Sequence, residues 1–140
     1  MEELFTHPVD VRYMEVDQQG VVFNSWYLVY FDDAMTQFLA ARGLPYESMI
    51  ARGYDVQLVN NETTWRKGVR WRDDVRIAVS PSRIGTTSFV LDFAVRVGEE
   101  GRVTGRTVYV VIATDGSGKR AIPAFLRDAL GTVVPLHPQG

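Results

Sequence analysis

The chain has 140 residues, of which 46% are hydrophobic, so it can fill one core and we expect a single domain over residues 1–140. Its 15 basic and 17 acidic residues leave a net charge of -2, which provides no overall field for nucleic acid, and the absence of cysteine excludes disulfides, thiolate nucleophiles and cysteine zinc sites. The N-terminus lacks the apolar core of a signal peptide, and no apolar run approaches the ~20 residues that span a bilayer, so we expect a cytoplasmic protein without stable membrane insertion.

The first predicted element is a strand over residues 9 to 13, because apolar side chains alternate there with Asp10 and Arg12. The strand leads to Asp17, which stands three residues before Gly20. Asp-x-x-Gly before a helix is common turn chemistry, since the aspartate can accept hydrogen bonds from its own backbone. On spacing alone, this structural interpretation ranks ahead of a catalytic one.

A long helix is predicted over residues 25 to 42, where apolar side chains recur at spacings of three and four and form one stripe. Asn24 or Ser25 can serve as its N-cap. Gly43 suits the left-handed position after the C-terminus, and Pro45 prevents continuation. A helix of this length extends roughly 27 Å, which is long enough to cross a sheet.

The rest of the chain is strand-like, apart from two short helical segments predicted around residues 46 to 53 and 122 to 131. Turns are predicted at residues 82 to 88 and 98 to 102. The predicted strands cover residues 54 to 65 with a bulge at Asn60 and Asn61, then 75 to 80, 89 to 97 and 107 to 113.

These elements indicate an α+β fold in which an antiparallel sheet of about five strands wraps against one long helix. Residues 107 to 113 are apolar on both faces, so that strand requires cover on both sides. One helix covers only one face of the sheet. A second subunit is the simplest source of the other cover.

The two histidines, His7 and His137, lie near the termini and each is next to a proline, a context that predicts loops or tails. A histidine-based catalytic triad would have to recruit a tail, and a histidine-rich metal centre cannot be assembled. If the chain is an enzyme, a carboxylate is therefore expected to carry its proton transfers, with no metal.

The position of Asp17 before the predicted helix suggests a second interpretation. The first turn of a helix has unpaired N–H groups and partial positive charge, so a carbonyl oxygen docked there would be polarised. Gly20 would let a ligand approach the backbone closely. A nearby carboxylate can attack the carbonyl or activate a water molecule. Because aspartate is a weak base with a pKa of roughly 3.9, a thioester with its good leaving group is a better substrate than a simple ester or amide.

Other residues give weaker signals. Asp32 and Asp33 fall in the second turn of the predicted helix, where negative charge complements the dipole, so a structural role accounts for at least one of them. Lys119 and Arg120 follow the glycine-rich turn TDGSG, and two cations on such a turn can hold a phosphate. Tyr27 belongs to an aromatic group that fills the core or a subunit interface, or lines an acyl pocket.

The stretch VRYMEVDQQGVVFNSWYLVYFDDAMTQFL resembles the signature of hotdog-fold acyl-CoA thioesterases of the 4-hydroxybenzoyl-CoA thioesterase type. The resemblance covers almost the whole chain, because WRKGVRWRDDVRI, the Ser-Phe pair at 88 and 89, and KRAIP are similar to later motifs in the same order. The chain departs from the family at Val21, where many members have histidine. It also departs at Gly68 and Arg72, which replace the usual proline and glycine.

The resemblance implies that Asp17 is the nucleophile or the general base, with Gly20 giving access to the carbonyl. It also implies that the backbone N–H of Asn24 polarises the thioester carbonyl. Some hotdog proteins place the essential carboxylate on the helix, so Asp32 and Asp33 remain alternatives to Asp17.

The resemblance further implies a homodimer or homotetramer with the acyl-CoA substrate at the subunit interface and no cofactor. Tyr27 is a candidate for binding the substrate, and Ser88, Lys119 and Arg120 are candidates for contacting the CoA portion. Nothing in the sequence chooses between CoA and an acyl carrier protein, and the acyl group stays open.

Two other functions are alternatives to thioester hydrolysis. The first is a non-catalytic protein that binds acyl thioesters or another small apolar ligand. The second is a dehydratase or hydratase of the same fold, which ranks lower because that chemistry depends on a histidine that this chain lacks in its predicted interior.

Overall fold

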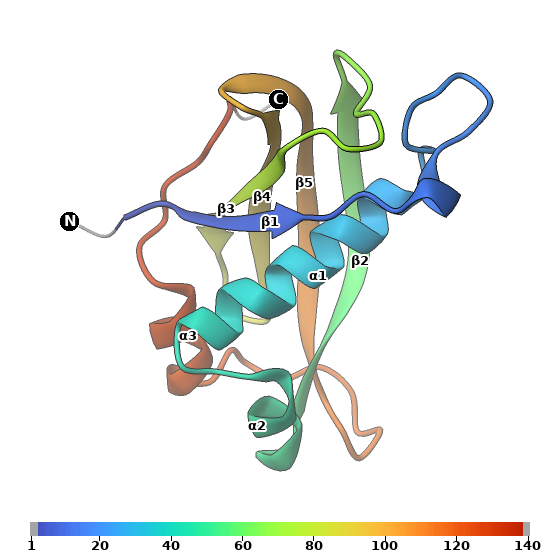
Figure 1. Ribbon diagram of the computed structural model, residues 1–140. Helices are drawn as coiled ribbons and strands as arrows, with labels where there is room; N and C mark the ends of the chain where they lie inside the picture. Colours follow the sequence, from blue (N-terminus) through green and yellow to red (C-terminus); the bar gives the residue numbers. More distant parts are fainter. Residues whose placement is uncertain (1–2, 139–140) are drawn as a thin grey trace.

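The computed structural model describes residues 3–138, which are traced in Figure 1 from the N-terminal strand to the C-terminal segment. Within these residues, no helix combines the length and the apolar composition required to cross a membrane. The elements are β1 (Phe5–Val9), the 3-10 turn η1 (Tyr13–Glu15), α1 (Trp26–Ala41), α2 (Tyr46–Ala51), β2 (Tyr54–Trp65), β3 (Val75–Ile84), β4 (Ser88–Val97), β5 (Glu100–Ala113) and α3 (Ala124–Leu130).

The five strands form one antiparallel sheet in the order β1-β3-β4-β5-β2. α1 runs diagonally across one face of this sheet, with β1 passing beside it (Figure 1). β1 and β2 are the two edge strands. The predicted α+β fold, with an antiparallel sheet of five strands against one long helix, is confirmed.

α1 faces the sheet with a stripe of large side chains. Tyr27, Phe31 and Phe38 are each at most 1% exposed, and Phe31 stacks on Phe93 of β4 with ring centroids 4.7 Å apart. β5 passes under this ring at Gly105, because a Cβ atom there would lie only 2.5 Å from the Phe31 ring. The predicted helix is confirmed to within one residue at each end.

The prediction of a first strand over residues 9 to 13 is wrong, because β1 spans Phe5–Val9 and pairs with β3. After β1 the backbone turns at η1, where the Glu15 N–H donates to the Arg12 carbonyl at 2.9 Å and the Arg12 N–H donates to the Glu15 carboxylate at 2.9 Å. Tyr13 is 73% exposed and does not continue the buried face. The alternation over residues 9 to 13 involves only neighbouring residues, whereas the turn after β1 depends on the Glu15 carboxylate.

The prediction that His7 lies in a loop or tail is also wrong, because His7 lies within β1. Its Nε2 atom is 3.1 Å from Oδ2 of Asp33 on α1, so it ties the edge strand to the helix. His137 lies in the C-terminal segment, where Nε2 is 3.1 Å from the carbonyl oxygen of Gly105.

The later strands lie where they were predicted, but β3 and β5 extend beyond their predicted ends. β2 is continuous, and its register shifts between Leu58 and Asn60, so the bulge lies at Val59, one residue before the predicted position. β3 continues to Ile84, so the turn after it is shorter than predicted and is closed by the Gly85 N–H donating to the Ser88 carbonyl at 2.8 Å. β5 begins at Glu100, seven residues before its predicted start.

The face of the sheet opposite α1 is partly covered by residues 131 to 138, which we call the C-terminal segment. The Ser80 hydroxyl donates to the Val134 carbonyl at 2.7 Å, and the Leu136 N–H donates to Asp92 at 2.9 Å. Asp92 is fully buried and accepts two hydrogen bonds from Arg106, at 2.7 and 3.0 Å. Part of the cover expected from a second subunit thus comes from the chain itself.

Candidate active site

The segment between η1 and α1 is a closed loop. Val16 and Val22 form an antiparallel bridge, and the Asp17 N–H donates to the Val21 carbonyl at 2.9 Å. The Gly20 N–H donates back to the Asp17 carbonyl at 3.0 Å, and Gly20 has a φ of +79°, which glycine adopts without strain. This loop holds Asp17 directly in front of the start of α1.

The Asp17 carboxylate is engaged on one oxygen only. Its Oδ1 atom accepts a hydrogen bond from the Gln19 N–H at 2.8 Å, which is the turn interaction expected of this spacing. Among residues 3–138, no donor lies within hydrogen-bonding distance of Oδ2. The turn interpretation of Asp17 is therefore correct, and it leaves the second oxygen available to a ligand.

A buried glutamate, which the sequence interpretation passed over, anchors this loop. Glu15 is 3% exposed, accepts the Tyr30 hydroxyl at 2.8 Å and forms an ion pair with Arg12 at 3.0 Å. Its carbonyl also accepts the Phe23 N–H at 2.9 Å. Burial alone would raise the pKa of Glu15, but the donors from Arg12 and Tyr30 outweigh it and hold the pKa below its usual range. The only feature of the sequence that could have indicated this anchor is the Arg-x-x-Glu spacing of Arg12 and Glu15.

Ser25 is the N-cap residue of α1, as one of the two predicted candidates, but its side chain makes no capping hydrogen bond. The Trp26 N–H donates to the Phe23 carbonyl at 3.0 Å, which closes the first turn through the backbone. In the part of the chain that the structure describes, the N–H groups of Asn24 and Ser25 find no acceptor. They are the donors that a docked oxygen atom would use.

Asp17 and Asn24 line one open hollow of about 410 Å³. The other residues in its wall are Gln18, Gln19 and Phe23, and Phe23 is 51% exposed. The residues in this wall thus include a carboxylate with a free oxygen, a backbone N–H without an acceptor and an apolar ring. These are the parts that acyl transfer requires of a protein.

Tyr27 lies behind this hollow and not in its wall. It is 1% exposed, and its hydroxyl accepts the Val69 N–H at 3.3 Å. The Val69 carbonyl accepts the Val22 N–H at 2.8 Å. The backbone of Val69 is therefore bonded both to the end of the Asp17 loop and to Tyr27 of α1. Burial raises the pKa of Tyr27, which keeps its hydroxyl neutral. Within one chain, Tyr27 supports the loop from the core.

Ser88, Lys119 and Arg120 gather at the other end of the sheet. Ser88 pairs with Val110, and Lys119 forms a bridge with Ile112. The Asp17 loop adjoins the end where Trp65 pairs with Val103, seven residues away along β5 and so roughly 23 Å distant.

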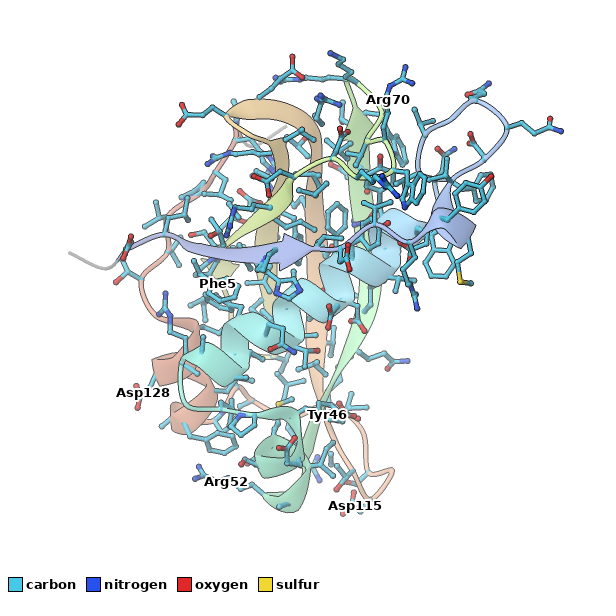
Figure 2. The ribbon with its side chains drawn as sticks, in the orientation of Figure 1. Phe5, Tyr46, Arg52, Arg70, Asp115 and Asp128 are labelled. Atoms are coloured by element: carbon cyan, nitrogen blue, oxygen red, sulfur yellow. The ribbon has the colours of Figure 1, made fainter. Side chains whose placement is uncertain are left out.

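Figure 2 shows the same separation between the two ends of the molecule. Arg70, whose Nη1 atom would lie 3.8 Å from a Cβ atom at Gly20, is at the opposite end from Asp115 in the loop that carries Lys119. The candidate phosphate-binding cations and Asp17 therefore do not share a site within one chain.

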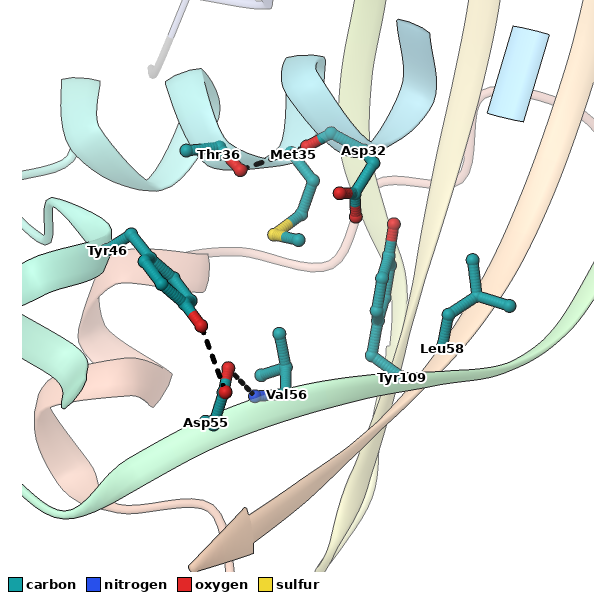
Figure 3. Close-up of a pocket in the computed structure, with 8 residues that line it drawn as sticks. All are labelled: Asp32, Met35, Thr36, Tyr46, Asp55, Val56, Leu58 and Tyr109. Atoms are coloured by element: carbon teal, nitrogen blue, oxygen red, sulfur yellow. Dashed lines mark hydrogen bonds between the residues drawn. The ribbon is translucent and has the colours of Figure 1, made fainter. Parts of the chain in front are cut away.

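The two helix carboxylates have different surroundings. Asp33 pairs with His7, whereas Asp32 lines a separate hollow of about 300 Å³ together with Tyr109 of β5 (Figure 3). Partial burial, and then the neighbouring charge of Asp33, raise the pKa of Asp32. Neither carboxylate reaches the Asp17 hollow.

The sequence pattern of the family described as "Thioesterase-like superfamily" matches residues 11–130. A protein of Aquifex aeolicus (strain VF5) with a provisional name as an esterase is 29% identical over 85 residues, which are 61% of this chain and 66% of the relative. The match thus spans slightly less than two thirds of that relative's length.

Two solved structures superpose closely on the fold. A hypothetical protein from Thermus thermophilus gives a TM-score of 0.84 at 29% identity, over 89% of this chain and 95% of that one. A 1,4-dihydroxy-2-naphthoyl-CoA thioesterase from Synechocystis gives a TM-score of 0.82 at 19% identity, over 91% and 96% of the two chains. At that identity, the second likeness concerns the fold alone.

Proposed function

Because the chain belongs to the thioesterase-like superfamily and has its hotdog fold, we propose that it is an acyl-CoA thioesterase that hydrolyses a thioester to a free acid and CoA. One observation carries the proposal. A carboxylate with a free oxygen, on Asp17, lines the same open hollow as the unpaired N–H of Asn24 at the start of α1.

The chemistry begins with the thioester carbonyl oxygen accepting the Asn24 N–H, which stabilises the negative charge that develops on that oxygen. In the nucleophilic route, Oδ2 of Asp17 attacks the carbonyl carbon, the carbon–sulfur bond breaks and CoA leaves as the thiolate, which then takes a proton from solvent. Water hydrolyses the resulting anhydride and regenerates Asp17. In the general-base route, Asp17 takes a proton from water as the water oxygen attacks the same carbon. The carbon–sulfur bond then breaks, and the departing CoA thiolate takes the proton from Asp17, directly or through solvent.

A second copy of the chain completes the site in this proposal. β2 is an edge strand of 12 residues whose middle is exposed, with Val59 53% exposed, and a long exposed edge is a template for pairing with another strand. Two copies of β2 paired antiparallel about a two-fold axis would bring opposite ends of the two sheets together. Lys119 and Arg120 of one copy would then lie near Asp17 of the other.

This arrangement gives the two ends of the substrate separate binding groups. The thioester lies at Asp17, whereas the phosphates of CoA meet Lys119 and Arg120, with Ser88 beside them at the start of β4. The separation of roughly 23 Å along β5 is the reason to assign these groups to two copies.

Mixing two inactive variants tests the proposal. Asp17→Asn chains are unfolded and refolded with an equal amount of chains carrying both Lys119→Ala and Arg120→Ala, and thiol release is measured at low acyl-CoA concentration. A mixed dimer has one site with Asp17 from one chain and both cations from the other. Half of the dimers are mixed and each has one intact site, so we expect about a quarter of wild-type activity.

Each variant refolded alone is the control for this mixture. If the cations act in the same chain as Asp17, no site in the mixture is intact. Activity equal to the average of the two separate variants would then reject the shared site, provided that light scattering shows the same oligomer for all samples.

A further inference from the structure

Three large apolar side chains stand exposed beside the Asp17 loop, and we call Tyr13, Met14 and Trp71 the apolar tip. Tyr13 and Met14 lie in η1 and are 73% and 68% exposed, and Trp71, in the loop before β3, is 43% exposed. The rings of Tyr13 and Trp71 are in contact, with centroids 5.1 Å apart. η1 and the loop after it project from the body of the molecule (Figure 1). Single exposed apolar residues are common, but a gathered group of this size indicates an interaction surface.

The segment that carries Trp71 is strongly basic. Residues 66 to 72 read RKGVRWR, with four cations and no carboxylate, although the whole chain has a net charge of -2. In the described part of the chain, neither Arg70 nor Arg72 forms an ion pair, whereas Lys67 is paired with Glu100 at 3.5 Å. The exposed rings therefore stand next to two positive charges that no carboxylate neutralises.

The backbone of Arg72 is strained in a way that keeps its charge on the tip. Its φ is 71°, and its guanidinium carbon lies 4.3 Å from the centroid of the Trp71 ring. Residues other than glycine rarely adopt this conformation, and such strain gathers at functional positions. Because glycine would adopt the same φ freely, the side chain of Arg72 is the reason to retain an arginine there.

The acidic residues of the two segments are mostly engaged elsewhere. Glu15 of η1 is buried and paired with Arg12, and Asp73 is paired with Arg102 at 3.7 Å. Asp17 lines its own hollow. The cations of the basic segment are therefore open to an anion from outside the chain.

We propose that the apolar tip binds the surface of an anionic lipid bilayer. Tyrosine and tryptophan favour the boundary between water and acyl chains, where the ring is buried and the polar atom stays hydrated. Met14 would enter the acyl region beside them, while Arg70 and Arg72 meet the lipid phosphates. The attachment is peripheral and reversible, because it uses side chains and no membrane-spanning element. It does not rest on the proposed function.

Two other partners fit the tip less well. A second copy of the chain, related by a two-fold axis through the tip, would bring Arg70 and Arg72 against the same two cations. A nucleic acid would need open ring faces on which to stack its bases, but Arg72 already lies over the Trp71 ring and Tyr13 packs against it. A lipid surface requires neither a complementary shape nor a free ring face.

Cosedimentation with lipid vesicles tests the inference. The full chain is mixed with vesicles of equal parts phosphatidylglycerol and phosphatidylcholine, and separately with vesicles of phosphatidylcholine alone. We expect binding to the anionic vesicles that weakens as salt is added, and binding to the neutral vesicles that is weaker by about tenfold or more. Failure to bind the anionic vesicles at low salt would overturn the inference.

Substitutions show whether the tip is the surface that binds. Tyr13→Ser combined with Trp71→Ser should lower the partition coefficient by about tenfold or more, and Arg70→Gln should lower it by about fivefold. The matched controls are Val133→Ser in the C-terminal segment and Arg76→Gln on β3, which replace an exposed apolar residue and an exposed arginine outside the tip. The controls should bind as the wild type does. Equal binding by the tip variants and the controls would reject the tip as the binding surface.

Arg72→Gly separates lipid binding from folding. Glycine accepts the φ of 71° without strain, so the variant should fold with a Tm close to that of the wild type. Its binding to anionic vesicles should nevertheless fall by about fivefold, because one cation at the surface is lost. Wild-type binding by this variant would contradict the inference.

The other two partners predict different results. Light scattering should give the same oligomer for the wild type and for the variant with both Tyr13→Ser and Trp71→Ser, whereas a smaller oligomer would show that the tip is a subunit contact and would overturn the inference. Binding of a single-stranded oligonucleotide that depends on the tip, with no binding of vesicles, would overturn it as well. None of these measurements requires thioester hydrolysis, so the inference and the proposed function can fail separately.

Discussion

Replacing Asp17 by asparagine is expected to lower kcat for acyl-CoA hydrolysis by a factor of roughly 10² to 10⁴ while the fold stays intact. Asparagine keeps an oxygen that can accept the Gln19 N–H, which Oδ1 of Asp17 accepts at 2.8 Å. The turn is therefore preserved and only the charged oxygen is lost. Steady-state thiol release, with circular dichroism and light scattering on the same samples, measures the effect.

Asp10→Asn is the matched control for this substitution. Asp10 is exposed and lies outside the Asp17 hollow, so the same loss of charge there should change kcat by less than about twofold. Asp17→Asn protein that retains wild-type turnover would show that Asp17 is only a turn residue. Asp32 would then be the next carboxylate to replace.

The largest effect on stability is expected at Asp92, which is fully buried and paired with Arg106 at 2.7 Å. Asp92→Asn leaves the guanidinium group without its counter-ion, and breaking such a buried pair costs about 3–5 kcal/mol. It also weakens the bond from the Leu136 N–H, at 2.9 Å, that holds the C-terminal segment. Urea unfolding of the variant and the wild type at pH 7 gives the difference in the free energy of unfolding.

The difference in the free energy of unfolding between the wild type and Asp92→Asn should change with pH in one direction. Burial alone would raise the pKa of Asp92, but the hydrogen bonds from Arg106 and Leu136 outweigh it and hold the pKa below its ordinary value of 3.8. The stabilisation is therefore complete above pH values near 3.8 and is lost as the pH falls through the lower folded pKa. The gap between wild type and Asp92→Asn should shrink in acid, and a gap that grows would contradict this assignment. Asp74→Asn, an exposed carboxylate, is the control.

Most of the fold could be predicted because its signals are local. The three-and-four spacing of the α1 stripe and the alternation in the strands depend only on neighbouring residues. The first strand could not be placed, because the turn at Glu15 depends on the buried contacts of its side chain with Arg12 and Tyr30. The hotdog fold expected from the resemblance is confirmed.

The departures from the family pattern have a visible effect on the backbone. Arg72, where the resemblance leads us to expect glycine, has a φ of 71°, a region that non-glycine residues rarely adopt. Gly68 is in close contact with the loop, because a Cβ atom there would lie 2.6 Å from Val21. Gly68 therefore stands where the loop leaves no room for a side chain.

The site was predictable only where its parts are close in sequence. Asp17 and Asn24 lie in one loop, so a motif could link them. Tyr109 of β5 is brought close to Asp32 by the packing of α1 on the sheet, and no local pattern in the sequence signals that proximity. The positions of Lys119 and Arg120 relative to Asp17 depend on a second copy in our proposal, which the sequence of one chain does not encode locally.

Thiol release by the wild-type chain across a panel of aromatic, short-chain and long-chain acyl-CoAs tests the central claim most directly. We predict that at least one member releases free thiol and free acid in equal amounts, many times faster than without protein. Binding of these compounds with no release of thiol would contradict the claim and would identify a non-catalytic acyl-thioester binding protein.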